Sequence, residues 1–219
     1  IGFESSDAFN NAGTGHSAFC ELNYTPIDKN GVVNIDKAIN IAKQFETSKE
    51  FWSYLVENNY VSSPEKFLRP TPHMSFVWGD EDVDFLKKRH EKLSQHPLFK
   101  DMEYSEDFAK IKEWAPLIVN GRNESEKVAA THMNLGTDVN FGELTRQIFQ
   151  GLENKNEITL ETEHEVKDLT RLSNGKWAVK VKDLKSGNNK AVNADFVFIG
   201  AGGGAILLLQ KSGIPESKK

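Results

Sequence analysis

The chain has 219 residues, of which 38% are hydrophobic and 27% charged, and it carries a formal net charge of −5. This balance is typical of a globular protein with an apolar core, and the lack of a basic stripe argues against a nucleic-acid partner. The single cysteine, Cys20, excludes an intramolecular disulfide. No apolar run approaches the roughly 18 residues that cross a bilayer, and no secretory signal is recognisable, so a reducing, cytoplasmic compartment is expected.

A loop is expected first, followed by a mostly helical region over about 26–130. Residues 5–25 are small and polar, which is typical of an ordered loop. After Asn34, a candidate N-cap, apolar residues recur at three- and four-residue spacing. The pattern predicts a helix over 34–58, a strand over 74–78, a helix from 80 or 82 to 95, and helical turns over 108–114.

The rest of the chain is expected to form a helix, a strand meander and a short closing helix. Asn140 followed by Glu143 is a capping-box pattern, which predicts a helix to about Leu152. Two-residue periodicity then indicates strands, and Asn174–Gly175 is a strong hairpin signal. The predicted strands cover 158–161, 165–172, 176–183 and 191–199, and the closing helix covers 207–211.

These elements predict an α+β fold in which a mixed or antiparallel sheet is combined with a helical cap. By character, the chain divides into a loop segment over 1–25, a helical and mixed region over 26–130, and a helix with a strand meander over 131–219. Because the chain begins with Ile1 inside motif-rich sequence, we expect an internal piece of a longer protein.

A glycine-rich run, 200–205, follows a predicted strand and opens a helix in the G-x-G-x-x-A pattern of dinucleotide-binding proteins. That pattern also needs a second strand with an acidic residue about 20 positions later, and only 14 residues follow Ala205. An independent dinucleotide site is therefore disfavoured. The run is interpreted as a turn that approaches a cofactor bound mainly elsewhere, with a packing turn as the alternative.

A second candidate is the loop over 10–17, whose small polar residues let backbone amides approach a ligand closely. It lacks the G-K-[ST] ending of a phosphate-binding loop. A surface turn is the alternative interpretation.

Several stretches of this sequence resemble malate:quinone oxidoreductases. They are 11–18 continuing through 20–26, 72–79, 113–117 leading to 121–122, and 136–142. The segment 194–203 is similar to the late flavin-contacting strand of the wider D-amino-acid-oxidase-like flavoprotein group. Each match is short, but four in the same order are specific together.

The resemblance implies an FAD-dependent dehydrogenase that oxidises (S)-malate to oxaloacetate with a quinone as acceptor, in the tricarboxylic acid cycle. Its partners would be L-malate and quinone, with no nucleic acid, and the full-length enzyme would lie peripherally on the inner face of the bacterial cytoplasmic membrane. The alternatives are a flavoenzyme for another 2-hydroxy acid or an amino acid, or a non-catalytic module whose sheet edge binds a partner strand.

The departure from the family is that its N-terminal Rossmann βαβ unit, which holds the FAD pyrophosphate, has no counterpart here. We therefore expect part of an FAD-binding domain only, and a fragment that is inactive and lacks FAD. The residues expected near the cofactor are Asn11, Ala12, Gly13, Thr14, Gly15, Val166, Gly200, Ala201 and Gly202.

Malate oxidation needs a base and groups that hold carboxylates. Histidine suits proton abstraction near neutral pH, and His73 and His16 are the candidate bases. A guanidinium binds both oxygens of a carboxylate, so Arg122 is the first candidate substrate ligand, followed by His132 and Arg69. The alternatives are a surface arginine at Arg122 and a core histidine at His73.

No metal-ligand spacing occurs. Cys20 is interpreted as a packing residue, and a nucleophilic pair with His16 is the disfavoured alternative.

Overall fold

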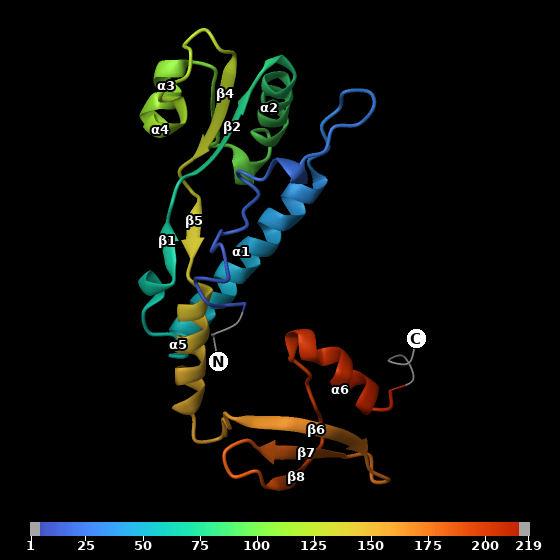
Figure 1. Ribbon diagram of the computed structural model, residues 1–219. Coiled ribbons are helices and arrows are strands. Elements are labelled where there is room, and N and C mark those ends of the chain that lie inside the picture. Colours follow the sequence, from blue (N-terminus) through green and yellow to red (C-terminus); the bar gives the residue numbers. More distant parts are fainter. Residues whose placement is uncertain (1–4, 215–219) are drawn as a thin grey trace. The chain divides into compact units, whose positions relative to one another are not determined.

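The computed structural model describes residues 5–214, which fold into two compact units with a boundary between Asn156 and Glu157. These residues combine α-helices with three antiparallel sheets, so the expected α+β fold is confirmed (Figure 1). The boundary follows the helix that ends at Glu153, inside the segment 131–219 that sequence character groups together.

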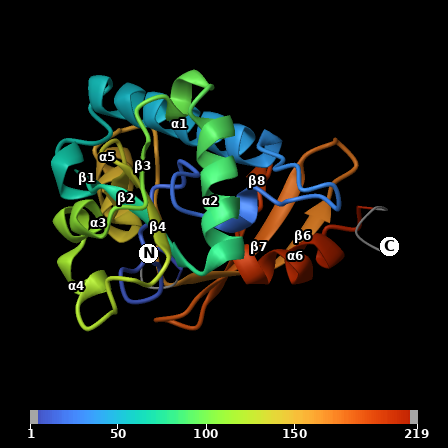
Figure 2. The same ribbon diagram turned by 90° about the horizontal axis from the view of Figure 1, so that it is seen from above.

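The first unit is built on a three-stranded sheet. β2 (His73–Trp78) pairs with β4 (Val128–Met133), which also pairs with β3 (Glu103–Ser105). α2 (Asp80–Leu93) covers one face of this sheet, and α3 (Phe108–Trp114) lies on the other side with the short α4 (Pro116–Val119) (Figures 1 and 2). The sheet therefore separates two side-chain environments.

Each face of the sheet has its own hydrophobic cluster, because successive residues of a strand point to opposite sides. Val77 packs with Leu86 of α2. Met74 and Phe76 instead pack on the side of α3 and α4 (Pro116–Val119). Alternation along β2 thus decides which side chains can meet.

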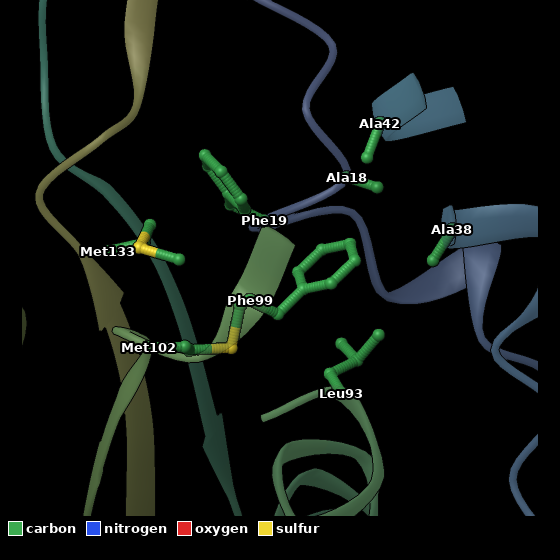
Figure 3. Close-up of a cluster of buried hydrophobic side chains, with 8 residues drawn as sticks. All are labelled: Ala18, Phe19, Ala38, Ala42, Leu93, Phe99, Met102 and Met133. Atoms are coloured by element: carbon green, nitrogen blue, oxygen red, sulfur yellow. The ribbon is translucent and has the colours of Figure 1, made fainter. Parts of the chain in front are cut away.

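The long helix α1 (Asp36–Glu57) confirms the helix predicted over 34–58. Its small residues Ala38 and Ala42 lie one turn apart and are buried beside the N-terminal loop (Figure 3). The cluster consists of Ala18, Phe19, Ala38, Ala42, Leu93, Phe99, Met102 and Met133. Residues 17–19 of the loop are consequently part of the core.

A second, small sheet pairs β1 (Leu68–Pro70) with β5 (Thr137–Val139). α5 (Phe141–Glu153) follows directly, and the Asn140 side chain accepts a hydrogen bond from the Glu143 N–H at 3.0 Å. This confirms the predicted N-cap.

The second unit is the predicted meander of β6 (His164–Arg171), β7 (Trp177–Asp183) and β8 (Asn189–Ala194). The Asn174–Gly175 turn joins the first two strands, with Gly175 at φ +82°. α6 (Ala205–Lys211) contacts β6. Short 3₁₀ turns lie at Leu22–Tyr24, Pro64–Lys66, Pro97–Phe99 and Gly202–Gly204.

Two predicted strands are wrong in whole or in part. Residues 158–161 form no strand, and the strand predicted over 191–199 ends at Ala194. Residues 196–200 are apolar enough for a central strand, but a strand needs a hydrogen-bonding neighbour. No such neighbour for this segment occurs among residues 5–214.

Candidate functional site

The loop over 11–17 is attached to β5 by backbone hydrogen bonds. The Gly15 N–H donates to the Thr137 carbonyl at 2.9 Å, and the Val139 N–H donates to the Gly13 carbonyl at 2.6 Å. The loop thus lies beside β5, on the side opposite β1.

The chain's own packing explains the glycines of this loop. A Cβ added to Gly15 would overlap the Thr137 side chain, and Gly13 has φ +71°. Asn11 accepts a hydrogen bond from the Gly13 N–H at 2.8 Å, and both Asn11 and Ala12 are exposed. The Asn11 amide also donates to the Ser5 carbonyl at 3.1 Å, so the chain's own contacts account for both the glycines and the asparagine of this loop.

Arg69, Asp138 and Thr14 lie side by side across β1, β5 and the loop. Arg69 lies opposite Asp138 in the β1–β5 register, and Asp138 lies opposite Thr14 of the loop. Directly opposed residues share a face of the sheet. The exposed Arg69 guanidinium has no hydrogen-bond or ion-pair partner among residues 5–214. Asp138 Oδ1 lies close to Gly13.

His16 lies against an acidic side chain. Its Nδ1 is 3.3 Å from Oε1 of Glu21, whose side chain is only 17% exposed, whereas that of His16 is 58% exposed. Neither Glu21 oxygen has an aligned N–H or O–H donor among the described residues, and the adjacent Cys20 thiol is a weak donor to this carboxylate. His16 also borders a pocket of about 240 Å³ whose other lining residues are Ile41, Gln44, Phe45, Ser48, Trp52 and Phe141.

His73 is a buried histidine with both ring nitrogens engaged. Nε2 lies 3.1 Å from the Thr137 carbonyl, to which it must donate, and Nδ1 lies 3.8 Å from the Cys20 sulfur. Burial, followed by the charge of Glu21, raises the pKa of Cys20 to about 11. Cys20 therefore remains a thiol that contacts His73, and the Cys20–His16 nucleophile pair is not formed.

Arg122 is already satisfied by the chain. It donates to both carboxylate oxygens of Glu126 at 3.0 and 2.9 Å and to the Ile118 carbonyl at 3.1 Å. Its guanidinium also lies 5.0 Å from the ring centres of Phe76 and Trp78. A pocket of about 340 Å³ borders it.

His132 lies on the same face of the sheet as Arg122. Its ring stacks on Trp114 with centroids 5.0 Å apart and a 9° tilt. Nδ1 is 3.8 Å from Glu103 Oε1, too far for a hydrogen bond. His132 pairs with Met74 on that face, whereas His73 belongs to the other set of β2 side chains. The structure does not bring His73 together with Arg122 or His132.

In the second unit, the structure does bring predicted cofactor residues together. Val166, Gly200 and Ala201 line one pocket of about 230 Å³. Gly202 adjoins it at φ +50°. The rest of the lining is apolar and consists of Leu169, Val179, Val197, Phe198, Ile199 and Leu208.

The sequence model of the malate:quinone oxidoreductase (Mqo) family matches residues 1–219. This chain belongs to that family. A probable malate:quinone oxidoreductase from Flavobacterium johnsoniae is 55% identical over 97% of the chain, and one from Geobacillus sp. is 56% identical over 99%. The chain spans 43% and 42% of the lengths of these two relatives of the family.

The fold of this chain has a counterpart among solved structures. L-proline dehydrogenase from P. horikoshii aligns with a TM-score of 0.55 over 80% of this chain and 42% of that chain. The sequences are 20% identical, so the likeness concerns the fold alone.

Residues 5–214 hold no helix that combines the length and apolarity needed to cross a bilayer. In the same residues, no group of three or more His, Cys, Asp or Glu side chains is arranged to bind a metal.

Sequence reasoning missed two acidic residues of this family member, Glu21 and Asp138. Both lie within the stretches that carry the family resemblance, 20–26 and 136–142. An acidic residue five positions after His16 was the available signal for Glu21. No pattern in the neighbouring sequence indicated Asp138, because its position beside Thr14 depends on a contact between distant segments.

Proposed function

We propose that the full-length protein oxidises (S)-malate to oxaloacetate, with FAD as cofactor and a quinone as electron acceptor. The family match over residues 1–219 carries this proposal, and relatives of 55% and 56% identity bear the name of this activity. Because the chain spans only 43% and 42% of those relatives, the activity is proposed for the whole protein.

For FAD, we propose the pocket formed by Val166, Gly200 and Ala201. Within residues 5–214, no atom beyond the adjoining residues lies within 4 Å of a Cβ added to Gly202 or Gly203, so this backbone is open to a ligand. The pocket volume of about 230 Å³ is below the roughly 300–1,000 Å³ of sites that enclose a whole ligand. The pocket therefore fits one portion of the dinucleotide. When bound, FAD supplies the acceptor for the substrate hydride.

For a substrate carboxylate, we propose Arg69 ahead of Arg122. A guanidinium binds a carboxylate through two parallel hydrogen bonds, and the Arg69 guanidinium has no partner among the described residues. Arg122 already uses its Nε and Nη1 donors on a backbone carbonyl and on Glu126, whose carboxylate neutralises its charge. Arg69 also adjoins the 11–17 loop through Asp138, whereas His132 lies on the α3 and α4 side of the three-stranded sheet.

For the base, we propose His16 ahead of His73. Oxidation at C2 of malate removes the hydroxyl proton and a hydride from the carbon, which leaves a carbonyl. The exposed His16 ring can reach a ligand and take that proton. His73 is buried, and its two ring nitrogens serve the Thr137 carbonyl and Cys20. We assign His73 to the packing of β2 against β5.

Quinones are dissolved in membranes, so the full-length protein must meet a membrane surface to pass electrons on. We propose peripheral association with the inner face of the cytoplasmic membrane. The alternative is a protein free in the cytoplasm that meets its acceptor only transiently.

The full-length protein, L-malate and an artificial electron acceptor test the proposal. We expect turnover with L-malate and the absorbance of stoichiometric FAD. Turnover only with 2-hydroxyglutarate or an amino acid would replace the substrate and keep the flavoenzyme assignment. A colourless, inactive full-length protein would favour a non-catalytic binding module.

A further inference from the structure

Glu21 is a buried carboxylate whose role the proposed function leaves open. Its side chain is 17% exposed, neither oxygen has an aligned N–H or O–H donor among the described residues, and the neighbouring Cys20 thiol is only a weak donor to it. A buried carboxylate without donors is strongly disfavoured. The nearest ionisable ring is that of His16, with Nδ1 at 3.3 Å.

Arg89 is a cation close enough to interact with Glu21, but its donors are used elsewhere. The fully buried guanidinium donates to the Thr25 hydroxyl at 3.1 Å and to the carbonyls of Ala18 at 3.0 Å and Phe19 at 3.2 Å. Arg89 therefore holds the backbone between His16 and Glu21 in place, and it leaves the Glu21 oxygens to another donor.

The turn that joins His16 to Glu21 is rigid for the same reason. Ser17, Ala18 and Phe19 are buried, and Ala18 adopts φ +59°. Such a backbone conformation persists only where surrounding contacts impose it. The separation of His16 and Glu21 is thus set by the core in Figure 3 rather than by a flexible loop.

We propose that Glu21 is a positioning residue that accepts the Nδ1 proton of His16 and so selects the tautomer of its ring. This inference rests on the proposed role of His16 as base. With Nδ1–H directed to the carboxylate, the Nε2 lone pair is left on the exposed side of the ring, ready to take the malate hydroxyl proton. Once His16 is protonated, the Glu21 carboxylate stabilises the imidazolium.

The first test reads the ring directly and needs no turnover. In full-length protein with ¹⁵N-labelled histidine, NMR reports which nitrogen of His16 carries the proton, and His16→Asn assigns the signal. We expect the Nδ1–H form in the native protein and a shift toward the Nε2–H form in Glu21→Ala. The control is Glu113→Gln. The Glu113 side chain is 68% exposed and pairs with Lys110, so this variant should leave the His16 tautomer unchanged.

The second test is a double-mutant cycle on kcat and KM for malate. His16→Asn should lower kcat by about 10²–10⁴-fold, the usual contribution of a general base. Glu21→Ala should lower kcat by about 10–100-fold with little change in KM. In the His16→Asn background, Glu21→Ala should lower kcat hardly any further, because Glu21 acts through His16.

The outcomes separate the two proposals. An unchanged His16 tautomer, or an equal kcat loss for Glu21→Ala with and without His16, overturns the role of Glu21. Full activity of His16→Asn overturns His16 as base, although malate oxidation itself still stands. If Glu21→Ala does not fold, Glu21→Leu, which fills similar space without an acceptor, serves in both tests.

Discussion

Arg69 and Arg122 carry the same charge but differ in what surrounds them. Arg122 is half-buried between Glu126 and the rings of Phe76 and Trp78. The Arg69 guanidinium is exposed and has no partner within residues 5–214. A cation that is already paired gains little from a ligand, so the unpaired one is the better candidate for an anionic substrate.

In the full-length enzyme, Arg69→Met should therefore raise the KM for L-malate by roughly 30-fold or more, which corresponds to about 2 kcal/mol or more for a lost charge pair. Arg122→Met should leave this KM nearly unchanged and lower the free energy of unfolding by about 1 kcal/mol, because its ion pair is partly exposed. Steady-state kinetics and urea unfolding measure both effects. A raised KM in Arg122→Met with an unchanged KM in Arg69→Met would show that Arg122 binds the malate carboxylate instead.

Cys20 gives a prediction for alkaline pH. Burial, then Glu21, raises the pKa of its thiol from 9.0 to about 11. Because the thiolate is the reactive form, alkylation of the Cys20 peptide should be slow at about pH 8 in the folded protein and faster toward about pH 11. Mass spectrometry measures the rate, with urea-unfolded protein as the control.

The same shift has a consequence for stability. A folded-state pKa above the unfolded value contributes stability that is fully present below the unfolded pKa and lost as pH rises through the folded one. For Cys20 the loss falls between about pH 9 and about pH 11. Equal alkylation rates for folded and unfolded protein would contradict this assignment.

Among the elements, the 11–17 loop and β5 act as one unit because their backbones touch. A Cβ at Gly15 would overlap the Thr137 side chain and lie 2.8 Å from its carbonyl oxygen. Contacts this close are possible only without a side chain. The loop can hold His16 beside its pocket because Gly15 brings it against the sheet.

Gly15→Ala should lower the free energy of unfolding of the full-length protein by about 1–3 kcal/mol through overpacking. The matched control is Gly31→Ala, where the added Cβ meets no atom within 4 Å and only the strain of φ +79° remains, about 1 kcal/mol. Urea denaturation measures the difference. No loss of stability in Gly15→Ala would show that the loop does not pack on β5 as described.

For the molecule as a whole, the two units differ in how well they bury apolar residues. In the first unit, Leu86, Phe99 and Ile111 are fully buried. In the second, Phe196 and Phe198 are 79% and 84% exposed. The chain spans about two fifths of its relatives, 43% and 42% in two of them, so a family member has more sequence than residues 5–214 to cover such groups.

The sequence by itself determined the features that depend on neighbouring residues. Periodicity located α1 and α2, the Asn140 cap located α5, and the Asn174–Gly175 turn located the β6–β7 hairpin. Helices and tight turns form contacts within a few residues, so their signals are local. The family resemblance likewise rests on short linear stretches.

Only the tertiary structure decided what depends on distant segments. β1, β3 and β5 have three residues each and exist because of partners far along the chain, so no local pattern predicted them. Strand alternation placed His73 and Arg122 on opposite sides of one sheet, although both are candidates by residue type. The pairing of His16 with Glu21 needed the buried turn that Arg89 holds. Residue type indicates which chemistry is possible, whereas packing decides which groups can meet.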